Sequence, residues 1–217
     1  MTDGALDIIL LALVAGFILL RLRSVLGRRT GHERPPTRPV EDNVLPLPDR
    51  RPKDGAPAPV VDLPAGSPVA AGLARIKMAD AGFDDAEFVG GSKAAYEMIV
   101  GAFAAGDLDT LRSMLAPEVL TGFRQAIEDR QKAGHKLETT VKAIRAAEII
   151  EADLRGTMAE VTVKFVSDLV NVTRDAGGQL ISGAPNVAEE VTDIWTFSRN
   201  TRSSDPNWTL IGTATPA

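Results

Sequence analysis

Few residues of this chain have the types and spacing that chemistry requires, and the closest pair is a carboxylate and a tyrosine. Asp193 shares strand parity with Trp195 and Phe197, so its side chain is expected on the same face as two large apolar residues. Small isomerases use such a carboxylate to move a proton, with a tyrosine hydroxyl as hydrogen-bond donor, and Tyr96 is available for that role. The structural alternative is that Asp193 is hydrogen-bonded at the edge of a sheet, or capped by a helix, while Tyr96 packs in the core.

The other reactive groups do not form a recognisable site. His32 lies in a proline-rich stretch and His135 in a Gly-His-Lys turn, so neither is placed as a catalytic base. The sequence has no cysteine, no cluster of histidines and carboxylates at metal-ligand spacing, and no glycine-rich phosphate loop after a strand. Gly90 and Gly91 are too few for such a loop, and we expect them to let a helix approach its neighbour. We therefore expect no cofactor, no metal and no enzymatic activity.

Helices are predicted for the first half of the region that would hold these residues. Apolar residues recur at helical spacing after an acid-rich start at Asp84, and Gly106 is a stop signal. Asp107 can cap a short second helix, and Pro117 stands at a favoured first-turn position for a third, which ends near Gly134. A further helix over 70–81 is expected to pack loosely or to swing on the segment before it.

The second half is predicted to form strands, because apolar and polar residues alternate there. Four strands are expected, at about 139–150, 161–165, 191–197 and 207–215, with connections short enough for an antiparallel meander. Helices followed by strands indicate an α+β fold, with the helices on one face of a curved four-stranded antiparallel sheet. Five aromatic residues between these layers form either ordinary core or a hydrophobic pocket: Phe88, Phe103, Phe123, Trp195 and Phe197.

An apolar run at the start of the chain predicts attachment to a membrane. Residues 5–26 are predicted to be a transmembrane anchor, in which Arg21 and Arg23 snorkel to one interface; an interfacial amphipathic helix is the alternative. Within and before this anchor, only the acids Asp3 and Asp7 precede the uncharged stretch 8–20, whereas Arg21, Arg23, Arg28 and Arg29 follow it. Basic residues beside a span favour the cytoplasmic side, so we expect a single-pass protein of the bacterial inner membrane with a cytoplasmic C-terminal domain. Its arginines could also contact acidic lipid.

Composition divides the remainder of the chain into a tether and a folded region. Residues 27–68 are basic and then proline-rich, and they are predicted to be a disordered tether. An accessory helix at 69–82 and an α+β domain at 83–217 are expected after it. Residues 54–217 contain fifteen Lys or Arg and twenty-three Asp or Glu, which argues against nucleic acid as a partner.

Several segments, taken in their order along the chain, resemble a known family. They are Leu-Arg-Ser-Val-Leu-Gly-Arg-Arg-Thr-Gly at 22–31, the stretch 88–107, Phe123 with Ile127 and Arg130, and Val-Thr-Asp-Ile-Trp-Thr-Phe-Ser-Arg at 191–199 with Asn207-Trp208. In these places the chain is similar to bacterial relatives of the forty-four-kilodalton subunit that tethers the motor of the mitochondrial inner-membrane protein-import translocase. The resemblance implies a cone-shaped α+β domain of the nuclear-transport-factor-2 type, with an apolar cavity, at an inner membrane with acidic lipid.

These observations predict a membrane-anchored scaffold or docking protein in protein transport or envelope assembly. Its partners would be proteins of the transport or chaperone machinery, and the sequence predicts no oligomeric state. The alternative is a module that binds lipid or another hydrophobic ligand, and an isomerase built on Tyr96 and Asp193 ranks below it. A cavity that holds these two side chains within reach of each other would favour ligand processing. A cavity closed by apolar side chains, or open to the surface, would favour docking.

Overall fold

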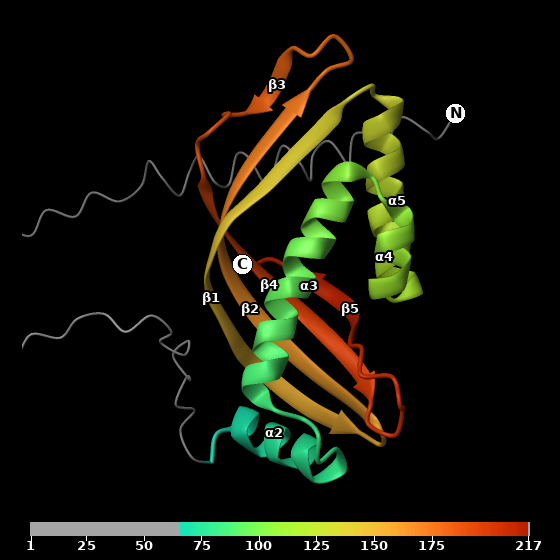
Figure 1. Ribbon diagram of the computed structural model, residues 1–217, viewed down its shortest axis with the longest axis vertical. Coiled ribbons are helices and arrows are strands. Elements are labelled where there is room, and N and C mark those ends of the chain that lie inside the picture. Colours follow the sequence, from blue (N-terminus) through green and yellow to red (C-terminus); the bar gives the residue numbers. More distant parts are fainter. Residues whose placement is uncertain (1–65, 217) are drawn as a thin grey trace, which may run out of the picture. The chain divides into compact units, whose positions relative to one another are not determined.

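An antiparallel sheet with helices on one face forms the part of the chain that the computed structural model describes, residues 66–216 (Figure 1). The α+β class predicted from the sequence is confirmed. The predicted anchor at 5–26, most of the predicted tether at 27–68, His32 and the basic residues Arg21, Arg23, Arg28 and Arg29 lie outside the described residues. Within residues 66–216, no helix combines the length and the apolar character needed to cross a bilayer.

The helices begin and end at the local signals that the sequence displays. They are α2 (Pro68–Ala79), α3 (Asp85–Ala105), α4 (Leu108–Met114) and α5 (Pro117–Lys132). The Asp84 carboxylate accepts hydrogen bonds from two backbone N–H groups of the first turn of α3, and Asp107 does the same for α4. Gly106 ends α3 with a φ of 74°, a conformation that favours glycine. The three helices predicted from Asp84 to Gly134 are thereby confirmed.

In the described part of the chain, five strands make up the sheet: β1 (Lys136–Arg155), β2 (Met158–Arg174), β3 (Leu180–Gly183), β4 (Glu189–Asn200) and β5 (Thr209–Ala214). Their order is β1-β2-β4-β5 with every pair antiparallel, as a meander requires. The prediction of four strands is wrong, because β3 pairs with the last residues of β2. Its four residues, Leu-Ile-Ser-Gly, do not alternate between apolar and polar and are all exposed, so the alternation rule did not find this strand.

The sheet curves around the helices because β1 is irregular. Its register against β2 shifts at three places, and each such bulge bends the strand and increases its twist. Val161, Val163 and Phe165 of β2 face the helices and are fully buried, as are Tyr96 and, almost completely, Ile99 of α3. The core therefore lies between α3 and the inner face of the sheet.

Helix α2 belongs to this core, contrary to the expectation that it packs loosely. Leu73 and Ile76 are buried in the same apolar cluster as the residues of α3 and β2. Gly72 lies so close to β1 that a Cβ at this position would be 1.9 Å from the carbonyl oxygen of Ala152. The folded unit described by the structure therefore begins at Pro68 and not at residue 83, since removal of α2 would uncover part of the core.

Candidate functional site

A buried polar cluster joins α3 to the sheet at Tyr96. The Tyr96 hydroxyl donates a hydrogen bond to Oδ2 of Asp193 at 2.7 Å and lies 2.9 Å from Oγ of Ser167. Its ring stacks on Phe165 with centroids 4.8 Å apart and lies 4.7 Å from the ring of Trp195. The carboxylate and the tyrosine that sequence reasoning singled out are thus brought together, while Ser167, the third member, was missed.

Burial dominates the electrostatics of this cluster. It raises the pKa of Tyr96 above its usual value, so the hydroxyl keeps its proton and acts as a donor. Burial also raises the pKa of Asp193, and the hydrogen bond from Tyr96 opposes that shift. Neither Tyr96 nor Asp193 lines the two pockets described below. In this arrangement Tyr96 packs in the core, and its hydrogen bonds satisfy polar groups of β2 and β4.

The five aromatic residues proposed for one hydrophobic pocket lie in two groups. Phe88 contacts the edge of Phe197 at 6.1 Å between ring centroids. Trp195 contacts Phe197 at 6.3 Å between ring centroids and also packs beside Tyr96 in the polar cluster. Phe103 of α3 and Phe123 of α5 pair with each other, edge to face, at 5.2 Å. Of these five residues, Phe88 and Phe197 line an opening at the surface.

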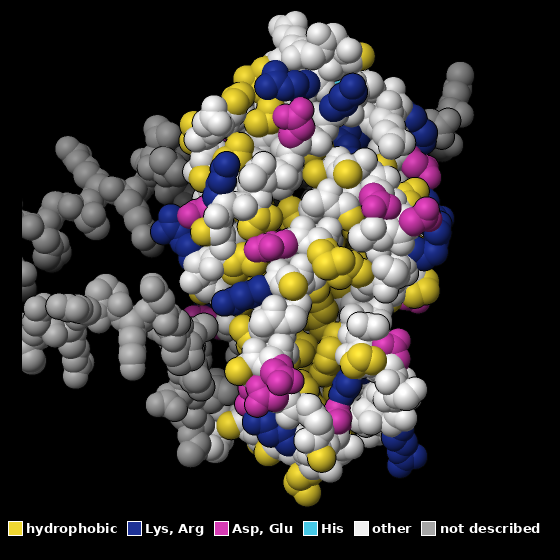
Figure 2. All heavy atoms as spheres, viewed as in Figure 1, with side chains coloured by type: hydrophobic (Ala, Val, Ile, Leu, Met, Phe, Trp, Pro, Cys, Tyr) yellow, Lys and Arg dark blue, Asp and Glu magenta, His cyan; other side chains and the backbone are white. Residues whose placement is uncertain are grey.

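That opening is a groove of about 580 Å3 beside α3, which we call the α3 groove. In Figure 2 it is the hollow between α3 and α4, where apolar side chains gather. Small residues and Met98 form its α3 wall, and Met114 of α4 lies on the other side. Its lining residues are Gly82, Phe83, Asp84, Glu87, Phe88, Gly91, Ser92, Ala94, Ala95, Met98, Ser113, Met114, Phe197, Arg199, Pro206, Asn207 and Trp208.

The charged residues of the α3 groove leave it acidic. Among residues 66–216, Arg199 is the one cation that lines the groove. It forms an ion pair with Asp80 and lies over the ring of Trp208, with its guanidinium carbon 5.4 Å from the ring centroid. Asp84 and Glu87 lie at the N-terminal end of α3, and within residues 66–216 neither forms an ion pair. The net charge at this end of the groove is therefore negative.

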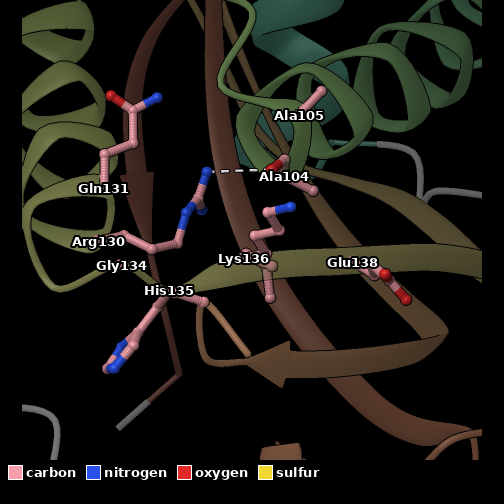
Figure 3. Close-up of a pocket in the computed structure, with 10 residues that line it drawn as sticks. Ala104, Ala105, Arg130, Gln131, Gly134, His135, Lys136 and Glu138 are labelled. Carbon is pink, nitrogen blue, oxygen red and sulfur yellow. Dashed lines mark hydrogen bonds between the residues drawn. The ribbon is translucent and has the colours of Figure 1, made fainter. Parts of the chain in front are cut away.

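A second pocket, of about 700 Å3, lies where α3 and α5 both end (Figure 3). Arg130 donates hydrogen bonds to the carbonyl oxygens of Phe103 and Ala104, and its guanidinium lies over the Phe103 ring. It thereby supplies the cation that the last turn of α3 lacks. In Figure 3 the His135 ring points away from Arg130 and Lys136.

Comparisons with known proteins agree with the resemblance found in the sequence. A family model described as the Tim44-like domain matches residues 69–215. A Caenorhabditis elegans protein described as a probable mitochondrial import inner membrane translocase subunit is 25% identical over 147 residues, which cover 64% of this chain and 34% of the relative. The chain thus matches about a third of the length of that relative.

Matches among solved structures are weaker. The intermembrane space region of the chloroplast protein ARC6 matches with a TM-score of 0.45 and 13% identity, over 62% of this chain and 98% of that one. A de novo designed β-sheet protein matches with a TM-score of 0.28 and 17% identity, over 60% of this chain and 88% of that one. The family model covers well over half of the chain, from the first turn of α2 to the end of β5. The chain therefore belongs to the Tim44-like domain family.

Proposed function

We propose that this protein is a membrane-anchored scaffold whose Tim44-like domain docks a protein partner at an inner membrane, in protein transport or envelope assembly. The observation that carries the proposal is the α3 groove, an apolar surface open to solvent on a domain whose relative is described as a translocase subunit. Residues 5–26 would be the single-pass anchor and 27–68 the tether, with the domain in the bacterial cytoplasm. A cone of the nuclear-transport-factor-2 type is part of the same proposal.

Crosslinking in intact membranes, followed by purification of the full-length chain, is expected to recover the same transport, chaperone or envelope proteins in repeated experiments. A scaffold holds its partners close enough for a short crosslinker to join them, and the anchor keeps the domain near membrane-bound partners. The control is a chain without residues 5–26, which should recover fewer membrane proteins. If neither chain recovers a reproducible partner, the docking function is wrong.

Binding of a lipid or another hydrophobic ligand is the second candidate function, and the aromatic floor of the α3 groove is the observation that favours it. Flotation of residues 66–217 with cardiolipin-containing vesicles at low salt separates the two candidates. We expect the fragment to stay in the unbound fraction, because Asp84 and Glu87 at the groove repel anionic headgroups. Neutral vesicles are the control, and retention on the anionic vesicles alone would favour lipid binding over docking.

A further inference from the structure

We propose that two copies of this protein pair edge to edge through β3, so that the sheets of the two copies become continuous. This inference goes beyond the proposed docking function and does not depend on it. It rests on three features of β3: an outer edge that no other described strand occupies, exposed apolar side chains along that edge, and an uncharged sequence that can meet its own copy without repulsion.

The outer edge of β3 is open within the described chain. Among the strands of residues 66–216, β3 pairs with β2 alone, and in Figure 1 it lies at the end of the sheet opposite α2. An edge strand presents unpaired backbone N–H and C=O groups, to which a strand of another chain can bind. The edge of β5 is less available, because the Leu210 carbonyl oxygen already accepts a hydrogen bond from the backbone N–H of Ala116.

The hairpin of β2 and β3 holds this edge in a fixed position. A Cβ at Gly183 would be 1.9 Å from the carbonyl oxygen of Asn171, so β3 lies directly against β2 there. Two hydrogen bonds close the turn before β3: the Asp175 N–H donates to the Gln179 carbonyl oxygen, and the Gln179 N–H donates to the Asp175 carboxylate. A strand that is already ordered loses little conformational freedom when it pairs.

Apolar side chains gather along this edge. Large apolar residues are seldom exposed in residues 66–216, yet Leu180, Ile181 and Val187 all are. Leu180 and Ile181 are adjacent near the centre of β3, so antiparallel pairing of two copies would place apolar side chains of one copy beside those of the other. Such cross-strand pairs stabilise a sheet by about 0.2–1 kcal/mol each.

The charge pattern favours a second copy as the occupant of this edge. A symmetric antiparallel pair brings each central residue close to its own counterpart, so a charge near the centre would repel itself. Residues 176–188 carry no charge at all. By contrast, β1 at the opposite edge of the sheet has eight charged residues among its twenty and three register shifts, and both features prevent pairing between edges.

The length of β3 limits the strength of the pair. Two strands of four residues bury less than the roughly 1,200 Å2 of a stable interface, so the association should be weak and reversible. The same patch of both copies forms the contact, so the assembly closes at two copies and does not extend into a fibre.

Cysteine crosslinking of the full-length chain, purified in mild detergent, tests the pairing. The chain has no cysteine, so a single introduced thiol reports on one position. Opposite residues of an antiparallel pair have Cα atoms about 4.5–5.5 Å apart, within the range of a disulfide. Under mild oxidation, Ile181→Cys should form a covalent dimer at least about tenfold faster than Ile211→Cys, because pairing holds the two sulfur atoms together.

Ile211 is the matched control because it is also an exposed isoleucine of an edge strand, β5. Its crosslinking reports the rate of random collision between copies. Equal rates for Ile181→Cys and Ile211→Cys would overturn the proposal.

Charge reversal across the pair gives a second, independent test. Ile181→Lys and Ile181→Glu should each remove the dimer seen by analytical ultracentrifugation, because each places like charges on both sides of the contact. A mixture of the two variants should associate again, since lysine of one copy then faces glutamate of the other. Ile211→Lys should leave the dimer intact. If mixing restores no association, the proposal is wrong.

Other arrangements give distinct results, and each of them would overturn the proposal. If a dimer forms but Ile181→Lys leaves it intact, the two copies associate through another surface. If Ile181→Cys forms no dimer while Ile181→Lys loses a different protein from crosslinked membranes, the edge of β3 pairs with that protein.

Discussion

Replacement of Gly72 by valine is expected to lower the free energy of unfolding of the domain by about 3 kcal/mol. The glycine holds α2 against β1, and an added Cβ would lie 1.9 Å from the carbonyl oxygen of Ala152. That oxygen belongs to the backbone of a paired strand, so it cannot rotate away as a flexible side chain would. Helix α2 must move instead, which uncovers Leu73 and Ile76. Urea unfolding followed by tryptophan fluorescence measures the loss, because both tryptophans lie in the described domain.

Gly90→Val is the control for the Gly72 prediction. It places the same β-branched side chain in a helix, but a Cβ at Gly90 meets nothing within 4 Å, so the free energy of unfolding should change by no more than about 0.5 kcal/mol. Hydrogen exchange gives a second readout, since Gly72→Val should reduce the protection of α2 more than that of β2. Equal urea midpoints for the two variants would mean that α2 is not seated on β1.

Local signals explain why the helix boundaries could be predicted and the role of α2 could not. Caps such as Asp84 and Gly106 act on residues within one turn, so the sequence displays them directly. The contact between Gly72 and Ala152 joins positions that are eighty residues apart, and nothing near either position indicates it. The same limit applies at Gly90 and Gly91, where the sequence shows small residues but not whether a neighbour fills the space beside them.

The aromatic residues show that a prediction from residue type alone fails when two residues lie far apart along one helix. Phe88 and Phe103 belong to one helix and were expected to share a pocket. Fifteen residues of α-helix separate them, which is about 22 Å along the axis. Phe88 therefore packs with Phe83, Phe197 and Trp208, whereas Phe103 packs with α5. The α3 groove was missed for a related reason, because its lining comes from segments far apart in the sequence.

The polar cluster was partly predictable, because strand parity indicates on which face of the sheet a side chain lies. Parity placed Asp193 on the inner face of β4, and the structure confirms that it meets Tyr96 there. Ser167 could have been found in the same way, since it continues the buried parity of Val163 and Phe165 in β2. A small polar residue on a buried face indicates a partner across the core. The sequence offered Tyr96 as a partner for Asp193 but did not show that Ser167 would join them.

Tyr96→Phe is expected to lower the free energy of unfolding by about 2 kcal/mol at neutral pH. The substitution preserves the stacking on Phe165 and removes only the hydroxyl. Ser167, which is fully buried, then loses its hydrogen-bond partner, and the half-buried carboxylate of Asp193 loses its donor. Urea unfolding at pH 7 measures the loss. An unchanged midpoint would show that water replaces the hydroxyl at both oxygens and that the cluster does not hold α3 on the sheet.

Asp193→Asn is expected to have the opposite effect at pH 7 and to raise the free energy of unfolding. Burial raises the pKa of Asp193 above its ordinary value of 3.8, so the folded state binds the proton more tightly than the unfolded state does. The stability of the unchanged protein should therefore fall as the pH rises from below 3.8 through the raised pKa, relative to a variant with no charge at this position. Asparagine keeps a hydrogen bond to Tyr96 without the desolvated charge.

Unfolding curves of Asp193→Asn and the unchanged protein between pH 3 and pH 8 test the sign. The two free energies of unfolding should approach each other at the acidic end, where the carboxyl group is protonated and neutral in both states, and should separate as the pH rises. The same comparison can be made in a Tyr96→Phe background, with and without Asp193→Asn. There the two free energies of unfolding should continue to separate up to a higher pH, because the lost hydrogen bond no longer opposes the raised pKa of Asp193. If Asp193→Asn is instead less stable than the unchanged protein at pH 7, the hydrogen bond from Tyr96 to the ionised carboxylate outweighs the cost of burying its charge. In that case Asp193 stabilises the domain as an anion.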